Sequence, residues 1–125
     1  MTKRILVVED NTLNFKLVRD VLEYAGYEVV GASSGEEGLQ LAKDLPPDLV
    51  LMDLQLPGID GTETMLRLRQ GVIAADVPVV ALSALAMHQD HESAQIAGFD
   101  GYLNKPISVR SFPQQVASFL SDERP

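Results

Sequence analysis

The sequence predicts a single α/β domain in which helices cover both faces of a parallel sheet. Short apolar segments alternate with longer segments of helical periodicity, and the links between them are short. This alternation indicates parallel strands, because each crossover between such strands needs a helix. Two of the apolar segments run directly into carboxylates, at Glu9-Asp10 and at Asp53. Open α/β sheets place their sites at this carboxyl edge of the strands.

Five strands and five helices account for the chain apart from its ends. The predicted strands are residues 5–8, 28–32, 49–53, 77–82 and 101–104. The predicted helices are residues 13–25, 33–45, 62–69, 84–97 and 108–120. An unbroken apolar run such as Leu49–Met52 indicates a strand buried on both faces. Asn11 or Thr12 can cap the first helix, and Gly26 ends it.

Each helix carries an apolar stripe that we expect to pack on the sheet. The predicted inward-facing side chains include Leu13, Leu17, Val18 and Leu22 in the first helix, Met65 and Leu66 in the third, and Val109, Phe112, Val116 and Phe119 in the last. Ser108 is the expected cap of the last helix. Pro113 falls in its first turns, where a missing N–H costs little.

Composition narrows the class of function. Residues 1–125 suit one domain, with the tail at 121–125 expected to fray. A net charge of −8 argues against nucleic-acid binding, which needs clustered Lys and Arg. The chain has no cysteine, which excludes disulfides and thiolate metal sites. No apolar run approaches the length of a membrane span, so we expect a cytoplasmic protein without a membrane partner.

Five polar side chains follow the predicted strands at their carboxyl ends: Glu9, Asp10, Asp53, Ser83 and Lys105. Taken singly, each has a structural explanation as a helix cap, a turn residue or a solvated surface residue. Together, at one edge of an otherwise apolar sheet, they indicate phosphoryl transfer to a carboxylate. In this interpretation Asp53 is the nucleophile, and Mg²⁺ relieves the repulsion among the acids. Lys105 and Ser83 would donate hydrogen bonds to the phosphate.

Four stretches of the chain then carry a resemblance to a known family. They are residues 8–11 (Val-Glu-Asp-Asn), 52–61 (Met-Asp-Leu-Gln-Leu-Pro-Gly-Ile-Asp-Gly), 81–84 (Ala-Leu-Ser-Ala) and 101–106 (Gly-Tyr-Leu-Asn-Lys-Pro). In these stretches the chain resembles a response-regulator receiver domain, of the single-domain CheY-like and DivK-like type. The resemblance implies a flavodoxin-like sheet with strand order 2-1-3-4-5, which is the order the general rules for such folds assign to CheY.

The resemblance also implies a set of roles. Asp53 would receive a phosphoryl group from a phosphohistidine on a sensor histidine kinase or a histidine phosphotransfer protein. Mg²⁺, for which Mn²⁺ can substitute, would be bound by Glu9, Asp10, Asp53 and the backbone carbonyl of Gln55. Lys105 would contact the phosphoryl group. The protein would control a downstream protein partner and would not turn over external substrates.

Switching and rate are further implications of the resemblance. Ser83 would move toward the phosphoryl group and Tyr102 would turn inward behind it. This would alter the face formed by residues 84–97, the last strand and the last helix, through which the chain can also form a homodimer. Gln55 and Leu85 would flank the path of hydrolytic water. Because Leu85 is apolar, we expect slow autodephosphorylation.

Two other classes of function share parts of this pattern. A haloacid-dehalogenase-type hydrolase also uses an aspartate and Mg²⁺, but it needs a second aspartate where this chain has Gln55. A pseudo-receiver that only binds a partner remains an alternative. His88 and His91 have no cysteine or further histidine nearby, so they indicate a solvated helix start rather than a metal site. Partner recognition is expected on the first helix, around Asn14, Phe15 and Val18.

Overall fold

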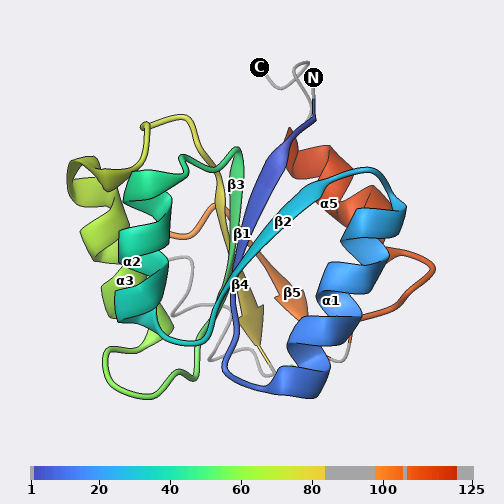
Figure 1. Cartoon of the computed structure of the whole chain (residues 1–125), viewed down its shortest axis with the longest axis horizontal. Coiled ribbons are helices and arrows are strands. Elements are labelled where there is room, and N and C mark those ends of the chain that lie inside the picture. Colours follow the sequence, from blue (N-terminus) through green and yellow to red (C-terminus); the bar gives the residue numbers. More distant parts are fainter. Residues whose placement is uncertain (1, 84–97, 106, 121–125) are drawn as a thin grey trace.

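The computed structural model describes residues 2–83, 98–105 and 107–120, and Figure 1 shows how the elements are arranged. The elements are β1 (Arg4–Val8), α1 (Thr12–Tyr24), β2 (Glu28–Ala32), α2 (Gly35–Asp44), β3 (Leu49–Asp53), α3 (Gly61–Arg67), the π-helical turn η1 (Leu68–Val72), β4 (Val79–Ser83), β5 (Gly101–Asn104) and α5 (Phe112–Leu120). The predicted helix at 84–97 and the tail at 121–125 lie outside the described residues.

The five strands form one parallel sheet in the order β2-β1-β3-β4-β5, which confirms the expected topology. The register aligns the ends of the central strands, because Val8 pairs with both Ala32 and Met52. One residue further, Asp53 pairs with Leu82. The residues that follow β1, β3 and β4 therefore leave the sheet at one common edge.

Helices cover both faces of this sheet, with α1 and α5 on one side and α2 and α3 on the other (Figure 1). Alternate residues of β1 point into two separate cores, Ile5 and Val7 into one and Leu6 and Val8 into the other. Each fully buried side chain of this size contributes about 1.5–3 kcal/mol relative to exposure. None of the helices in the described ranges combines the length and apolar character needed to cross a bilayer.

The first helix buries a narrower stripe than predicted. Asn11 is its cap, since its side chain accepts a hydrogen bond from the Asn14 N–H at 2.9 Å. Val18 and Leu22, one turn apart, are buried as predicted, whereas the predicted inward-facing Leu13 and Leu17 are 78% and 37% exposed. Leu13 lies in the first turn of α1, beside the edge where the strands end, so the prediction that it faces the core is wrong.

The third and last helices also differ from the prediction. Met65 is buried, but Leu66 is 43% exposed, because neighbouring residues on a helix point about 100° apart. The last helix begins at Phe112 rather than after Ser108, next to the proline that suits a first turn. Val109 therefore lies before the helix and is 59% exposed, so its predicted burial is wrong.

Candidate functional site

Asp53 is the last residue of the central strand β3, at the carboxyl edge of the sheet, as predicted. Only 3% of the residue is exposed. Its Oδ1 atom accepts a hydrogen bond from the Gln55 N–H at 3.0 Å, so the turn after β3 orients the carboxylate. A buried carboxylate needs a charged partner as well, because desolvating an unpaired charge is costly.

Lys105 provides that partner from the loop after β5. Its Nζ atom donates to Glu9 Oε1 at 2.8 Å and to Asp53 Oδ2 at 3.0 Å. The lysine side chain is 12% exposed, and the two carboxylate side chains are 1% and 4% exposed. The structure thus brings together Glu9, Asp53 and Lys105, which the sequence places far apart.

Asp10 completes an acidic group at the same edge. Carboxylate oxygens of Glu9, Asp10 and Asp53 lie within 4.8 Å of one another. Glu9 is 3% exposed, and its Oε2 atom accepts the Asn11 N–H at 3.2 Å, whereas Asp10 is open to solvent. Three oxygen donors at this spacing are the type of group that binds a hard divalent cation.

The crowding of charge changes how readily Glu9 ionises. Burial, followed by the hydrogen bond with Asp53, raises the pKa of the Glu9 carboxyl to about 7, against the opposing effect of Lys105. Burial alone would lower the pKa of Lys105, but its hydrogen bonds with Glu9 and Asp53 hold that pKa above its usual value. The lysine is therefore a permanent cation at neutral pH, while Glu9 is close to its titration point.

The structure describes three of the remaining predicted site residues and leaves Leu85 outside the described ranges. Ser83 ends β4, where it pairs with Asn104 in the neighbouring strand. Tyr102 is half-buried on β5 and packs against the core on the α2–α3 side. Gln55 is exposed in the turn after Asp53. Leu85, like His88 and His91, lies outside the described residues.

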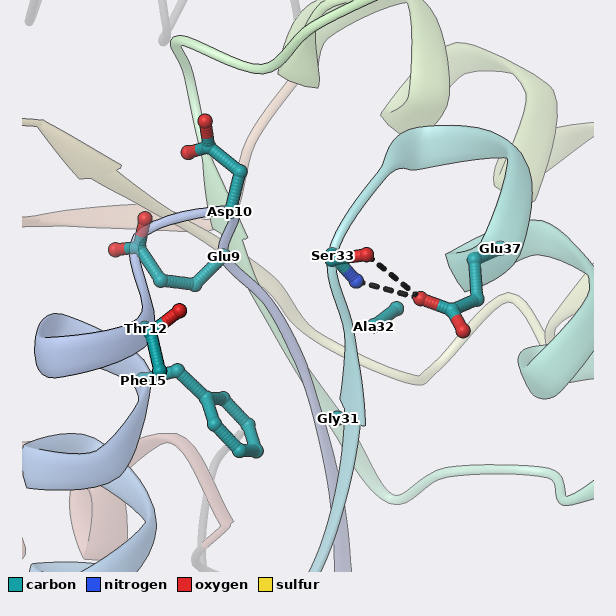
Figure 2. Close-up of a pocket in the computed structure, with 8 residues that line it drawn as sticks. All are labelled: Glu9, Asp10, Thr12, Phe15, Gly31, Ala32, Ser33 and Glu37. Carbon is teal, nitrogen blue, oxygen red and sulfur yellow. Dashed lines mark hydrogen bonds between the residues drawn. The ribbon is translucent and has the colours of Figure 1, made fainter.

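The sequence did not reveal a cavity of about 290 Å³ beside the acids, between the start of α1 and the β2–α2 turn. Figure 2 shows its walls, with the Phe15 ring directed toward Gly31 and with Ser33 bound to Glu37 on the far side. Phe15 approaches Gly31 so closely that a Cβ atom on the glycine would overlap its ring unless the ring moved. A glycine within a strand was the only sequence signal of this approach.

Replacing Asp53 by asparagine is expected to raise the melting temperature of the metal-free protein. The change removes one of three crowded acids, and Lys105 can still pair with Glu9. A gain of 1 kcal/mol corresponds to a rise of about 4 °C in a domain of this size. Thermal unfolding in EDTA and in excess Mg²⁺ checks this, and the Mg²⁺-induced rise should shrink. An unchanged melting temperature together with an unchanged Mg²⁺ effect would mean that the three carboxylates do not repel one another appreciably.

Comparison with known proteins identifies this arrangement. Residues 5–117 match the family described as the response regulator receiver domain. The chain is 44% identical over 122 residues to the polar-differentiation response regulator DivK of Brucella ovis, covering 98% of this chain and 99% of that protein. DivK of Brucella anthropi is 43% identical over the same length.

Solved structures agree with the sequence matches. A CheY-like receiver domain protein from Methanospirillum hungatei JF-1 superposes with a TM-score of 0.86 at 28% identity, covering 96% of this chain and 94% of that one. The receiver domain of a sensor histidine kinase from Pseudomonas aeruginosa PAO1, solved with magnesium in its active site cleft, gives 0.87 at 30% identity, covering 96% and 98%. These matches exclude the dehalogenase-type alternative. The chain belongs to the response regulator receiver domain family, signalling proteins of two-component systems that act with histidine kinases rather than turning over a substrate.

Proposed function

We propose that Asp53 is the phosphoryl acceptor of this receiver domain. One observation carries the proposal: a buried carboxylate at the end of the central strand lies against a lysine and within reach of two further acids. The donor would be a phosphohistidine on a sensor kinase or a phosphotransfer protein. An Asp53 oxygen attacks phosphorus, the P–N bond breaks, and the imidazole leaves with the electron pair and takes a proton from water.

We propose Mg²⁺ as the cofactor, with Mn²⁺ as a substitute. The donors present fit a hard cation, because Glu9, Asp10 and Asp53 supply only carboxylate oxygens. The Gln55 backbone carbonyl would be a fourth ligand. The magnesium found in the similar Pseudomonas receiver domain supports this assignment. When bound, the ion offsets negative charge on the transferring phosphoryl oxygens.

The residues of the chain have distinct tasks in this proposal. The Gln55 N–H holds Asp53 Oδ1 at 3.0 Å, which fixes the direction of the carboxylate. Lys105 Nζ, already 3.0 Å from Asp53 Oδ2, donates to a phosphoryl oxygen once the acyl phosphate has formed. Ser83 would donate its hydroxyl to the same group. Tyr102 would move further into the core behind it, and Gln55 and Leu85 would set the rate of hydrolysis.

Partner binding is proposed on two surfaces. The kinase or phosphotransfer protein would dock on the start of α1, where Leu13 and Leu17 are 78% and 37% exposed. Val18 is buried, so it does not contribute to recognition as the sequence suggested. The downstream protein, or a second copy of the chain, would bind the face of β5, α5 and residues 84–97. The last of these segments lies outside the described residues.

Intact-mass measurement after incubation with acetyl phosphate tests the proposal. We expect one phosphoryl adduct on the wild type in Mg²⁺, none in EDTA, and none on Asp53→Asn. Asp44→Asn is the matched control, because Asp44 is an exposed carboxylate at the end of α2; this variant should be modified like the wild type. An adduct that persists in Asp53→Asn would contradict the assignment. No adduct on any variant would favour the pseudo-receiver.

A further inference from the structure

The N-terminus of α3 rests directly on the backbone of the proposed phosphoryl acceptor. Gly61, the first residue of α3, donates its N–H to the Leu54 carbonyl at 3.3 Å. A Cβ atom on Gly61 would overlap the Asp53 carbonyl oxygen and lie 2.9 Å from Leu54 Cα. Both of these neighbours are backbone atoms, so they cannot rotate away as a side chain could.

The need for glycine at this position comes from space and not from backbone conformation. The described glycines with positive φ are Gly26, Gly58, Gly71 and Gly98, and Gly61 is not among them. An alanine could therefore adopt the backbone angles of Gly61 without strain. The added Cβ atom of such an alanine would instead clash with the peptide that joins Asp53 to Leu54.

A second close contact joins α3 to the start of α2. Thr64 is fully buried and donates its hydroxyl to the Asp60 carbonyl at 2.7 Å. Its Oγ1 atom packs so closely on Gly35, at the start of α2, that a Cβ there would overlap it. The first turn of α3 is therefore in close contact both with the Asp53–Leu54 peptide and with the start of α2.

We propose that Gly61 is a positioning residue for Asp53. Because Gly61 has no side chain, the start of α3 can pack directly on the Asp53–Leu54 peptide. This contact fixes the segment from Asp53 to Gln55 at the edge of the sheet. The segment carries both the carboxylate and the carbonyl that are proposed to hold the cation. The inference rests on the proposed function, since it takes Asp53 as the acceptor and Mg²⁺ as the ion.

Gly61→Ala compared with Gly31→Ala tests the inference. Gly31 is equally crowded, but its neighbour is the ring of Phe15, a side chain that can rotate. The two variants share the same substitution, and only Gly61→Ala presses on Asp53. The readouts are the Mg²⁺ dissociation constant from a titration of the amide chemical shifts, the initial rate of adduct formation at saturating Mg²⁺, and urea unfolding in EDTA.

Gly61→Ala is expected to weaken Mg²⁺ binding about tenfold or more, the usual size of an effect on residues that orient ligands. The rate of adduct formation should fall by a similar factor, since small misplacements of a nucleophile are costly. Gly31→Ala should stay within about twofold of the wild type in both, whatever its stability, because its added Cβ atom would meet the Phe15 ring and not the Asp53–Leu54 peptide. Equal losses in the two variants, or wild-type behaviour of Gly61→Ala, would overturn the inference.

Thr64→Val is the second variant if Gly61→Ala does not fold. It keeps the shape of the buried side chain but removes the hydroxyl that ties Thr64 to Asp60. Weaker Mg²⁺ binding in Thr64→Val supports the positioning role, and unchanged binding opposes it. A wild type that binds Mg²⁺ but forms no adduct would reject the proposed function alone, because the comparison of Mg²⁺ affinities still decides the role of Gly61.

Discussion

Lys105→Met is expected to destabilise the metal-free protein by about 3 kcal/mol at pH 8, the lower end of the cost of breaking a buried ion pair. Lys105 is the cation that contacts both Glu9 and Asp53, at 2.8 and 3.0 Å. Methionine keeps most of the volume and leaves the two acids facing each other without compensation. The same variant should form the phosphoryl adduct at least about 100-fold more slowly, because a charged donor to the transferring group is lost.

Urea unfolding in EDTA and intact-mass kinetics with acetyl phosphate measure these two effects. Lys43→Met is the matched control, because Lys43 is exposed in the last turn of α2 and has no contact with the acids. Mg²⁺ should recover much of the lost stability of Lys105→Met, since a cation can replace the missing charge. A variant as stable as the wild type at pH 8 would show that the lysine does not compensate the acids.

The stability of the metal-free protein is expected to fall as pH rises from 5 to 8. The pKa of Glu9 is raised from 4.5 to about 7, so between these values the folded state holds a proton that the unfolded chain has lost. Unfolding then releases a proton, and a higher pH favours it, by at most about 1.4 kcal/mol per pH unit. The total loss has a ceiling of about 3 kcal/mol and is complete above the folded pKa.

Urea unfolding in EDTA at pH 5, 6, 7 and 8 gives this slope for the wild type and for Glu9→Gln. The glutamine variant cannot ionise, so its curve should be flatter over the same range and should lie above the wild type at pH 8. Other titrating groups are common to both proteins and cancel in the difference. Parallel curves for the two proteins would mean that Glu9 titrates at its ordinary pKa. In saturating Mg²⁺ the wild-type curve should flatten toward that of Glu9→Gln, because the ion favours the charged form of Glu9 in the folded state.

Much of the fold was predictable because its signals are local. The apolar run before Asp53 and the carboxylate that ends it identify a central strand and its functional edge without any tertiary information. The common edge of a parallel sheet then brings Glu9 and Lys105 toward Asp53. Asp53 lies at the predicted edge, but the sequence did not show that only 3% of the residue would be exposed there. Pairing with Lys105 permits that burial.

Errors arose where the outcome depends on the placement of neighbouring elements. The apolar residues Leu13, Leu66 and Val109 satisfy helical spacing, but whether the sheet covers them depends on where each helix begins and ends. The close packing of Gly61 on the Asp53 backbone was also not predictable, because a glycine can occur in a turn for several structural reasons. Only the distance to a backbone carbonyl distinguishes close approach from simple flexibility.

The contact between Lys105 and Glu9 joins residues 96 positions apart in the chain. Lys105 follows β5, and β3 and β4 lie between β1 and β5, so this contact spans most of the width of the sheet. A nascent chain still short of its last strand therefore lacks the cation that its acids need. Glu9 and the cation that it shares with Asp53 thus come from opposite ends of the chain, so the site is complete only when the last strand is present.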